Sequence, residues 1–120
     1  IRYFWDAAVS LDPGAAQLHE GARFPLCHPT ALKAAFELAG LTEVDTTSLE
    51  QVAVFSDFED YWQPFLGGQG PAPAYAISLP EERRAALRDK LKSTLPSATG
   101  GVISLSARAW AVRGSYRGDA

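Results

Sequence analysis

Methionine is absent from the 120 residues, and cysteine occurs once, at Cys27. With a single cysteine, no intrachain disulfide can form and no cysteine-based zinc site is visible. This usage favours a reducing, intracellular setting, so we expect a cytoplasmic protein. A chain without methionine does not begin at a natural start codon. We therefore expect either a processed N-terminus or a piece of a longer protein.

Long apolar runs and an excess of basic residues are also missing. No apolar run approaches the ~20 residues that cross a bilayer, which argues against a membrane protein. Eleven basic residues stand against 14 acidic ones, giving a net charge of −3 at pH 7. The basic residues that do cluster, within 83–92, have acidic neighbours and are typical of a solvated helix face. We therefore expect neither a nucleic acid nor a membrane as partner.

Apolar residues make up 47% of the chain, which suits a globular core. Their spacing predicts a helix over 2–11, which the Asp-Pro-Gly sequence at 12–14 ends. Residues 14–27 look irregular. The stretch 29–40 combines a proline suited to a first helical turn with a glycine suited to a left-handed C-terminal cap, and so predicts a second helix. A strand is expected over 43–55.

Two capping-box signals shape the rest of the chain. Ser56 to Glu59 predicts a short helix that ends near Leu66. The glycines and prolines of 67–75 predict a loop. The second signal, Ser78 to Glu81, predicts a helix that places Leu87, Leu91 and Leu95 on one face.

Residues 102–112 predict a last strand that is apolar on both faces and so favours the interior of a sheet. A polar tail, 115–120, is expected to follow. Two strands alone are at best marginally stable, and this chain offers the last strand one neighbour. We therefore expect a missing N-terminal half or a second copy of the chain to complete the sheet. Exposed strand edges would then allow a homo-oligomer.

Four segments stand out by their order and spacing. Residues 27–44 form a capped helix that ends in an Ala-Gly-Leu turn and enters a strand. The flanking segments read Arg2-Tyr3-Phe4-Trp5-Asp6-Ala7-Ala8, then Asp57-Phe58-Glu59-Asp60-Tyr61-Trp62-Gln63-Pro64-Phe65 with Gly67-Gly68-Gln69-Gly70-Pro71, then Ser106-Ala107-Arg108-Ala109-Trp110-Ala111-Val112-Arg113-Gly114. Together, these segments resemble the C-terminal half of a class I S-adenosylmethionine-dependent methyltransferase of the small-molecule branch.

The resemblance covers residues 1–114 and implies an α/β, Rossmann-like fold, which as an isolated piece would be α+β. The two strands would be the sixth and seventh strands of the family, which form an antiparallel sheet edge with flanking helices. The family's cofactor motif, a strand followed by an acidic residue and a glycine-rich turn, is absent. The resemblance thus implies that S-adenosylmethionine belongs to the full-length protein and that this chain alone holds no cofactor and is inactive.

An apolar pocket for a small-molecule methyl acceptor is the site that the resemblance implies here. Its candidate lining residues are the aromatics of two segments and a nearby amide: Phe4, Trp5, Tyr61, Trp62 and Gln69. The competing interpretation of the aromatics is a structural core. No catalytic residue can be named, and methyl transfer to an acceptor that is already nucleophilic needs positioning more than acid–base chemistry.

The remaining reactive side chains favour structural interpretations. His19 and His28 lack an obvious partner for catalysis or metal binding at useful spacing. Cys27 is expected to be a buried structural thiol, because a nucleophile needs a positioned base. The acidic cluster at Asp57, Glu59 and Asp60 falls at a predicted helix N-terminus, where acids are favoured.

A second function stays open beside the methyltransferase piece. The chain could be a self-sufficient, non-enzymatic α+β module whose aromatic pocket binds a small ligand or a protein. Such a module would be a monomer that unfolds cooperatively, whereas an incomplete piece would be poorly stable or would associate through its strand edges.

Overall fold

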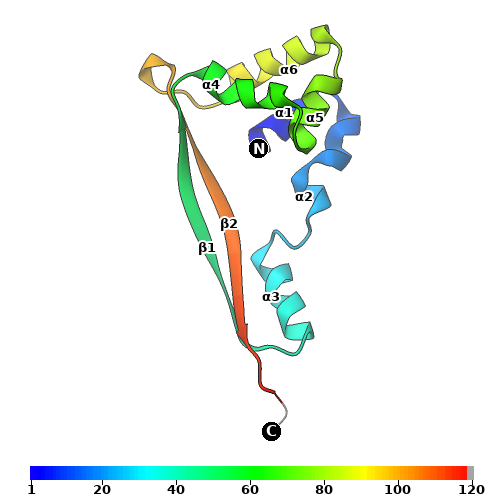
Figure 1. The fold of residues 1–120 in the computed structure, drawn as a ribbon, viewed down its shortest axis with the longest axis vertical. Coiled ribbons are helices and arrows are strands. Elements are labelled where there is room, and N and C mark those ends of the chain that lie inside the picture. Colours follow the sequence, from blue (N-terminus) through cyan, green and yellow to red (C-terminus); the bar gives the residue numbers. More distant parts are fainter. Residues whose placement is uncertain (119–120) are drawn as a thin grey trace. The chain divides into compact units, whose positions relative to one another are not determined.

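A computed structural model describes residues 1–118 of the chain (Figure 1). It is a mixed helix and strand fold, in which β1 and β2 pair as a two-stranded antiparallel sheet. This confirms the coarse α+β expectation. The elements run in the order α1 (Arg2–Leu11), η1 (Pro13–Leu18), α2 (Glu20–Arg23), α3 (Pro29–Leu38), β1 (Thr42–Phe55), α4 (Phe58–Trp62), η2 (Gln63–Gly67), α5 (Pro71–Ser78), α6 (Glu81–Thr94), η3 (Thr99–Gly101) and β2 (Ile103–Ser115), where η marks a 3-10 helix.

The chain divides into two compact units. The first, here called the helical unit, comprises Ile1–Arg23 and Ala53–Leu105. The second, here called the ribbon unit, comprises Phe24–Val52 and the chain from Ser106 onward. The paired strands contribute to both units, because β1 and β2 each cross the division.

The helical unit holds the hydrophobic core, around which α1, α4, α5 and α6 gather (Figure 1). The predicted helix over 2–11 is confirmed and buries Phe4 and Trp5. The predicted leucine face of the later helix is confirmed as well. Its members Leu87, Leu91 and Leu95 are all buried in the same cluster.

The predicted loop over 67–75 was wrong, because α5 occupies most of it. Pro71 stands at the first helical position, where a missing N–H costs no hydrogen bond, and Pro73 falls within the same first turn. The turn before the helix is made by Gly68 and Gly70, which both have positive φ. The two prolines thus open a helix at a place where their density suggests a loop.

The two capping-box signals differ in outcome. At the first, Asp57 replaces Ser56 as N-cap, and its Oδ1 accepts a 2.8 Å hydrogen bond from the Asp60 N–H. At the second, α6 has Pro80 as N-cap and no side-chain cap. The Ser78 hydroxyl instead donates to the Tyr75 carbonyl oxygen at 2.6 Å. Ser78 therefore ends α5 and does not begin α6.

Arg84 makes the main polar connection between α5 and α6. Its guanidinium donates to the carbonyl oxygens of Ala76, Ile77 and Leu79, at 3.0, 3.2 and 2.8 Å. These carbonyls lie at the end of α5, where carbonyl groups lack helical partners. Arg84 was expected on a solvated helix face, so this capping role is a finding of the structure.

In the first half of the chain, one prediction was wrong in part and another is confirmed. Residues 14–27 are not all irregular, because Pro13 opens η1 with Asp12 as its cap and α2 follows. The helix after His28 is confirmed as α3, and the predicted Gly40 cap has a φ of +92°.

Both predicted strands form, but β2 is less buried than expected. β2 extends to Ser115, and Ile103 is its one buried side chain, so the expectation of a strand buried on both faces is wrong within this chain. In β1, Val44 alone is buried. The predicted tail 115–120 begins in the last residue of β2, residues 116–118 have no regular structure, and 119–120 lie outside the described residues.

Candidate functional site

The aromatic side chains named from the sequence lie in the helical core. Phe4, Trp5, Tyr61 and Trp62 are all buried. Phe4 stacks on Phe65, with ring centroids 4.6 Å apart and planes 11° from parallel. The core interpretation of these aromatics is therefore confirmed, and their role toward an acceptor stays a prediction. Gln69, by contrast, is exposed in the turn before α5.

Two of these core residues carry polar atoms without a hydrogen-bond partner among the described residues, the Trp5 Nε1 and the Tyr61 hydroxyl. A buried donor that makes no hydrogen bond costs about 1–3 kcal/mol. Burial also raises the pKa of Tyr61 to about 12, because the phenolate would be cut off from water.

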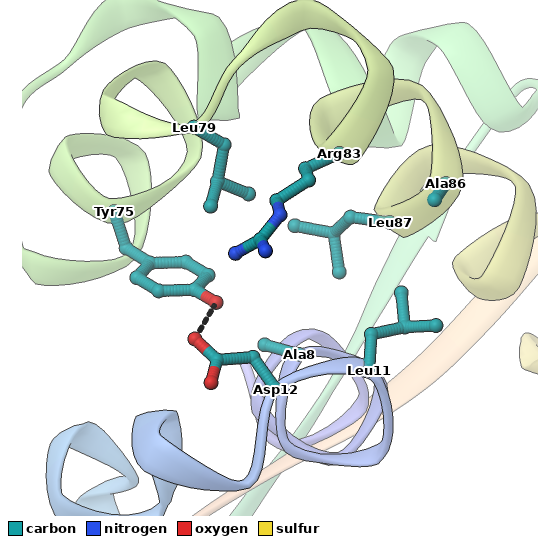
Figure 2. A pocket seen from close by; sticks show the side chains of 8 residues that line it. All are labelled: Ala8, Leu11, Asp12, Tyr75, Leu79, Arg83, Ala86 and Leu87. Carbon is teal, nitrogen blue, oxygen red and sulfur yellow. Dashed lines mark hydrogen bonds between the residues drawn. The ribbon is translucent and has the colours of Figure 1, made fainter.

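A groove lies elsewhere in the helical unit, between the end of α1, α5 and α6 (Figure 2). Its volume is about 190 Å³, above the ~150 Å³ at which an apolar cavity accepts a benzene ring. Apolar side chains form its walls, and three polar groups face it. The residues that line it are Ala8, Leu11, Asp12, Tyr75, Leu79, Arg83, Ala86 and Leu87.

Asp12 and Tyr75 form the one polar contact drawn across this groove (Figure 2). The Tyr75 hydroxyl donates to Asp12 Oδ2 at 3.2 Å, while Asp12 Oδ1 accepts from the Gly14 N–H at 3.1 Å. Partial burial raises the pKa of Tyr75, and the Asp12 charge raises it further. Tyr75 therefore stays a neutral hydrogen-bond donor and fixes the Asp12 carboxylate.

Arg83 brings a positive charge to the same groove. Figure 2 shows its guanidinium directed inward from α6, among Tyr75, Leu79 and Leu87. Within the part of the chain that the structure describes, this guanidinium has no hydrogen bond or ion pair. The groove thus presents one negative and one positive group that form no ion pair with each other among the described residues.

A second hollow, of about 370 Å³, lies beside α4 and the end of α6. Its two acidic groups have partners from outside its lining, and Asp57 caps α4 by accepting from the Asp60 N–H. Glu59 is paired with Arg88, and this hydrogen bond lowers the pKa of Glu59. Arg88 also lies 5.2 Å from the ring centre of Phe58. These contacts stabilise α4 against α6 and account for the acidic cluster without a ligand.

The other reactive side chains show no catalytic arrangement. Cys27 is exposed, so the expectation of a buried thiol was wrong: it precedes α3, which buries none of its residues. His28 is the N-cap of α3 and makes no side-chain cap bond. His19 Nε2 lies 3.0 Å from Asp6 Oδ1. Among the described residues, no group of histidine, cysteine and acidic side chains could hold a metal ion.

Comparisons of the chain with protein-family models, curated proteins and solved structures find no match. No helix among the described residues is long and apolar enough to span a bilayer. The assignment of function therefore depends on the residues and contacts above.

Sequence reasoning missed the groove between α1, α5 and α6. Asp12 was interpreted as a helix stop, Tyr75 as part of a loop, and Arg83 as part of a solvated face. The three residues come from separate elements and lack a common motif. The one signal available in the sequence was an acidic residue, Asp12, at the end of the predicted first helix. Such a residue is as typical of a helix cap as of a binding site.

Proposed function

We propose that this chain is the acceptor-side part of a class I S-adenosylmethionine-dependent methyltransferase that acts on a small molecule. One observation carries the proposal beyond the resemblance. The segments that resemble the sixth and seventh strands of that family pair antiparallel, and the helices that resemble its insertion lie between them in sequence. The family places these two strands in the same antiparallel relation.

The exposure of the paired strands supports an incomplete sheet. The apolar side chains of Leu49, Val52 and Val54 are 58%, 61% and 63% exposed. Two-stranded sheets are marginal in water, and apolar strands with free edges invite further strands. Additional strands of the same sheet would pair with the free edges, and helices packed on its faces would cover these side chains.

The residues of this chain do not fit S-adenosylmethionine. The turn Gly67–Gly70 opens α5, as a nucleotide-binding turn opens a helix, but it follows η2, where such a turn follows a strand. Pro71 and Pro73 also remove two of the N–H donors that would face a phosphate. In this proposal the cofactor belongs to another part of the protein, and this part shapes and positions the acceptor.

Binding measurements on two lengths of protein test the proposal. We expect isothermal titration of the 120-residue chain with S-adenosylmethionine to show no binding. We expect a longer protein that includes the reading frame upstream of Ile1 to bind it. Strong binding by the 120 residues, or an upstream frame without a glycine-rich strand–turn–helix segment, would overturn the proposal.

A self-sufficient binding module is the second candidate, and the closed core of the helical unit favours it. That unit buries Phe4, Trp5, Leu87 and Leu91 almost completely. Size-exclusion chromatography with light scattering separates the two candidates. A monomer that unfolds in one transition fits the module, while self-association supports an incomplete sheet.

A further inference from the structure

The groove between α1, α5 and α6 is lined by two oppositely charged side chains that do not pair with each other. Asp12 and Arg83 both line it, yet they form no ion pair in the described structure. Instead, Asp12 is held in place by Tyr75 and by the Gly14 N–H. Arg83 is exposed and Asp12 is held by other partners, so both charged groups are available to a ligand that carries the complementary charges.

Both charged groups keep hydrogen-bonding capacity. A carboxylate offers about four acceptor sites, and Asp12 uses two of them. A guanidinium offers five N–H donors, and Arg83 uses none within the described residues. The walls between these groups, formed by Leu79 and Leu87 among others, are apolar.

We propose that this groove binds a small zwitterion with an apolar body, such as an α-amino acid of the size of leucine. Its ammonium group donates to Asp12, its carboxylate accepts from Arg83, and its body packs on Leu79 and Leu87. The proposal rests on these contacts alone and is independent of the proposed methyltransferase function.

The charges of the groove disfavour simpler ligands of the same size. A ligand with a carboxylate but no ammonium group would form an ion pair with Arg83 but would be repelled by the negative charge of Asp12. A ligand with an ammonium group but no carboxylate would form an ion pair with Asp12 but would be repelled by the positive charge of Arg83. A zwitterion satisfies both, and its apolar body uses the walls as well, so selectivity among three matched molecules is the signature of this site.

Titration of the isotope-labelled 120-residue chain by NMR tests the proposal, with leucine, isocaproate and isoamylamine as probes. The latter two are leucine without its ammonium group and without its carboxylate. We expect leucine to shift the amide signals of Asp12, Tyr75 and Arg83 with a dissociation constant of ~1 mM. Each probe that lacks one charge should bind about tenfold more weakly. Equal binding of all three, or no shift at these residues, would overturn the proposal.

Two variants assign the charges separately. Asp12→Asn keeps one side-chain oxygen, which can still accept from the Gly14 N–H, and replaces the other with an NH2 that can donate to the Tyr75 hydroxyl. Arg83→Met keeps an unbranched, apolar stem. We expect each to weaken leucine binding about tenfold. Arg83→Met should leave isoamylamine binding unweakened, and Asp12→Asn should leave isocaproate binding unweakened. Lys90→Met is the control, because it removes an exposed charge of α6 that does not line the groove. An equal loss with Lys90→Met would contradict the site.

Discussion

The helical unit and the ribbon unit differ sharply in how many of their apolar side chains are buried. Among the described residues, every buried hydrophobic residue except Val44 lies in the helical unit. In the ribbon unit, α3 buries no residue, and Leu38 is 88% exposed. Because burial of apolar surface is the main favourable term in folding, the helical unit carries most of the stability of this chain. The ribbon unit leaves apolar side chains such as Leu38, Leu49 and Val52 exposed.

The largest expected effect on the free energy of unfolding comes from truncating a buried leucine of the helical unit, compared with an exposed leucine of the ribbon unit. Leu91→Ala removes a fully buried side chain from the helical core and should lower the free energy of unfolding by about 2–5 kcal/mol. Leu38→Ala, in the ribbon unit, should change it by less than about 0.5 kcal/mol. Urea denaturation followed by circular dichroism measures both. Comparable losses would show that the ribbon unit is buried in the folded protein in solution.

The next effect concerns polar contacts. Arg84→Met removes three hydrogen bonds from a charged donor to the end of α5, and we expect a loss of ~2 kcal/mol. Arg113→Met is the counterpart in the ribbon unit, where the side chain is 86% exposed and lies 3.9 Å from Asp45. That change should be close to neutral. Thermal unfolding of both variants gives the comparison, and an equal shift would contradict the capping role of Arg84.

The sequence predicted the helices and strands better than it predicted their surroundings. The helix over 2–11 and the leucine face of α6 were predicted because their apolar residues repeat with the period of a helix. The failures at α5 and at Ser78 have one cause. Proline, glycine and serine mark both the start and the end of a helix, and the neighbouring backbone decides between the two.

The candidate groove was outside the reach of sequence reasoning for a different reason. Asp12, Tyr75 and Arg83 are brought together by the packing of three elements, and each alone has an ordinary structural explanation. The prediction that Cys27 is buried was wrong for a similar reason, because cysteine is usually buried but α3, which follows it, buries none of its residues. Composition predicts burial only where tertiary contacts exist to provide it.

Two glycines test how tightly the backbone of each unit is packed. Gly68 and Gly40 both have positive φ, so alanine at either position costs ~1–2 kcal/mol of backbone strain. A Cβ on Gly68 would also lie 2.7 Å from Ile77 Cδ1, whereas a Cβ on Gly40 meets nothing within 4 Å. We expect Gly68→Ala to destabilise the chain more than Gly40→Ala in the same urea titration. A larger loss for Gly40→Ala would mean that the surroundings of Gly40 in solution are more tightly packed than those of Gly68.

The smallest expected effect reverses the usual sign of a core substitution. Tyr61→Phe removes a buried hydroxyl that has no hydrogen-bond partner among the described residues and should stabilise the chain by ~1 kcal/mol at pH 7. Tyr116→Phe, in the ribbon unit, changes a side chain that is 79% exposed and should leave stability unchanged. Loss of stability in Tyr61→Phe would mean that the hydroxyl is hydrogen-bonded in solution.

The same variant alters the alkaline limit of stability. Burial raises the pKa of Tyr61 to about 12 from its ordinary value of 10.0, so the unfolded chain releases this proton first. Ionisation in the unfolded chain therefore has no effect on stability below pH ~10 and lowers stability increasingly as the pH rises toward ~12. Tyr61→Phe should therefore flatten the fall in stability over this interval, with a remainder from Tyr75, whose pKa is also raised. Urea midpoints measured across this interval test it, and an unchanged slope would show that Tyr61 reaches water, so that the helical unit is less closed than its contacts indicate.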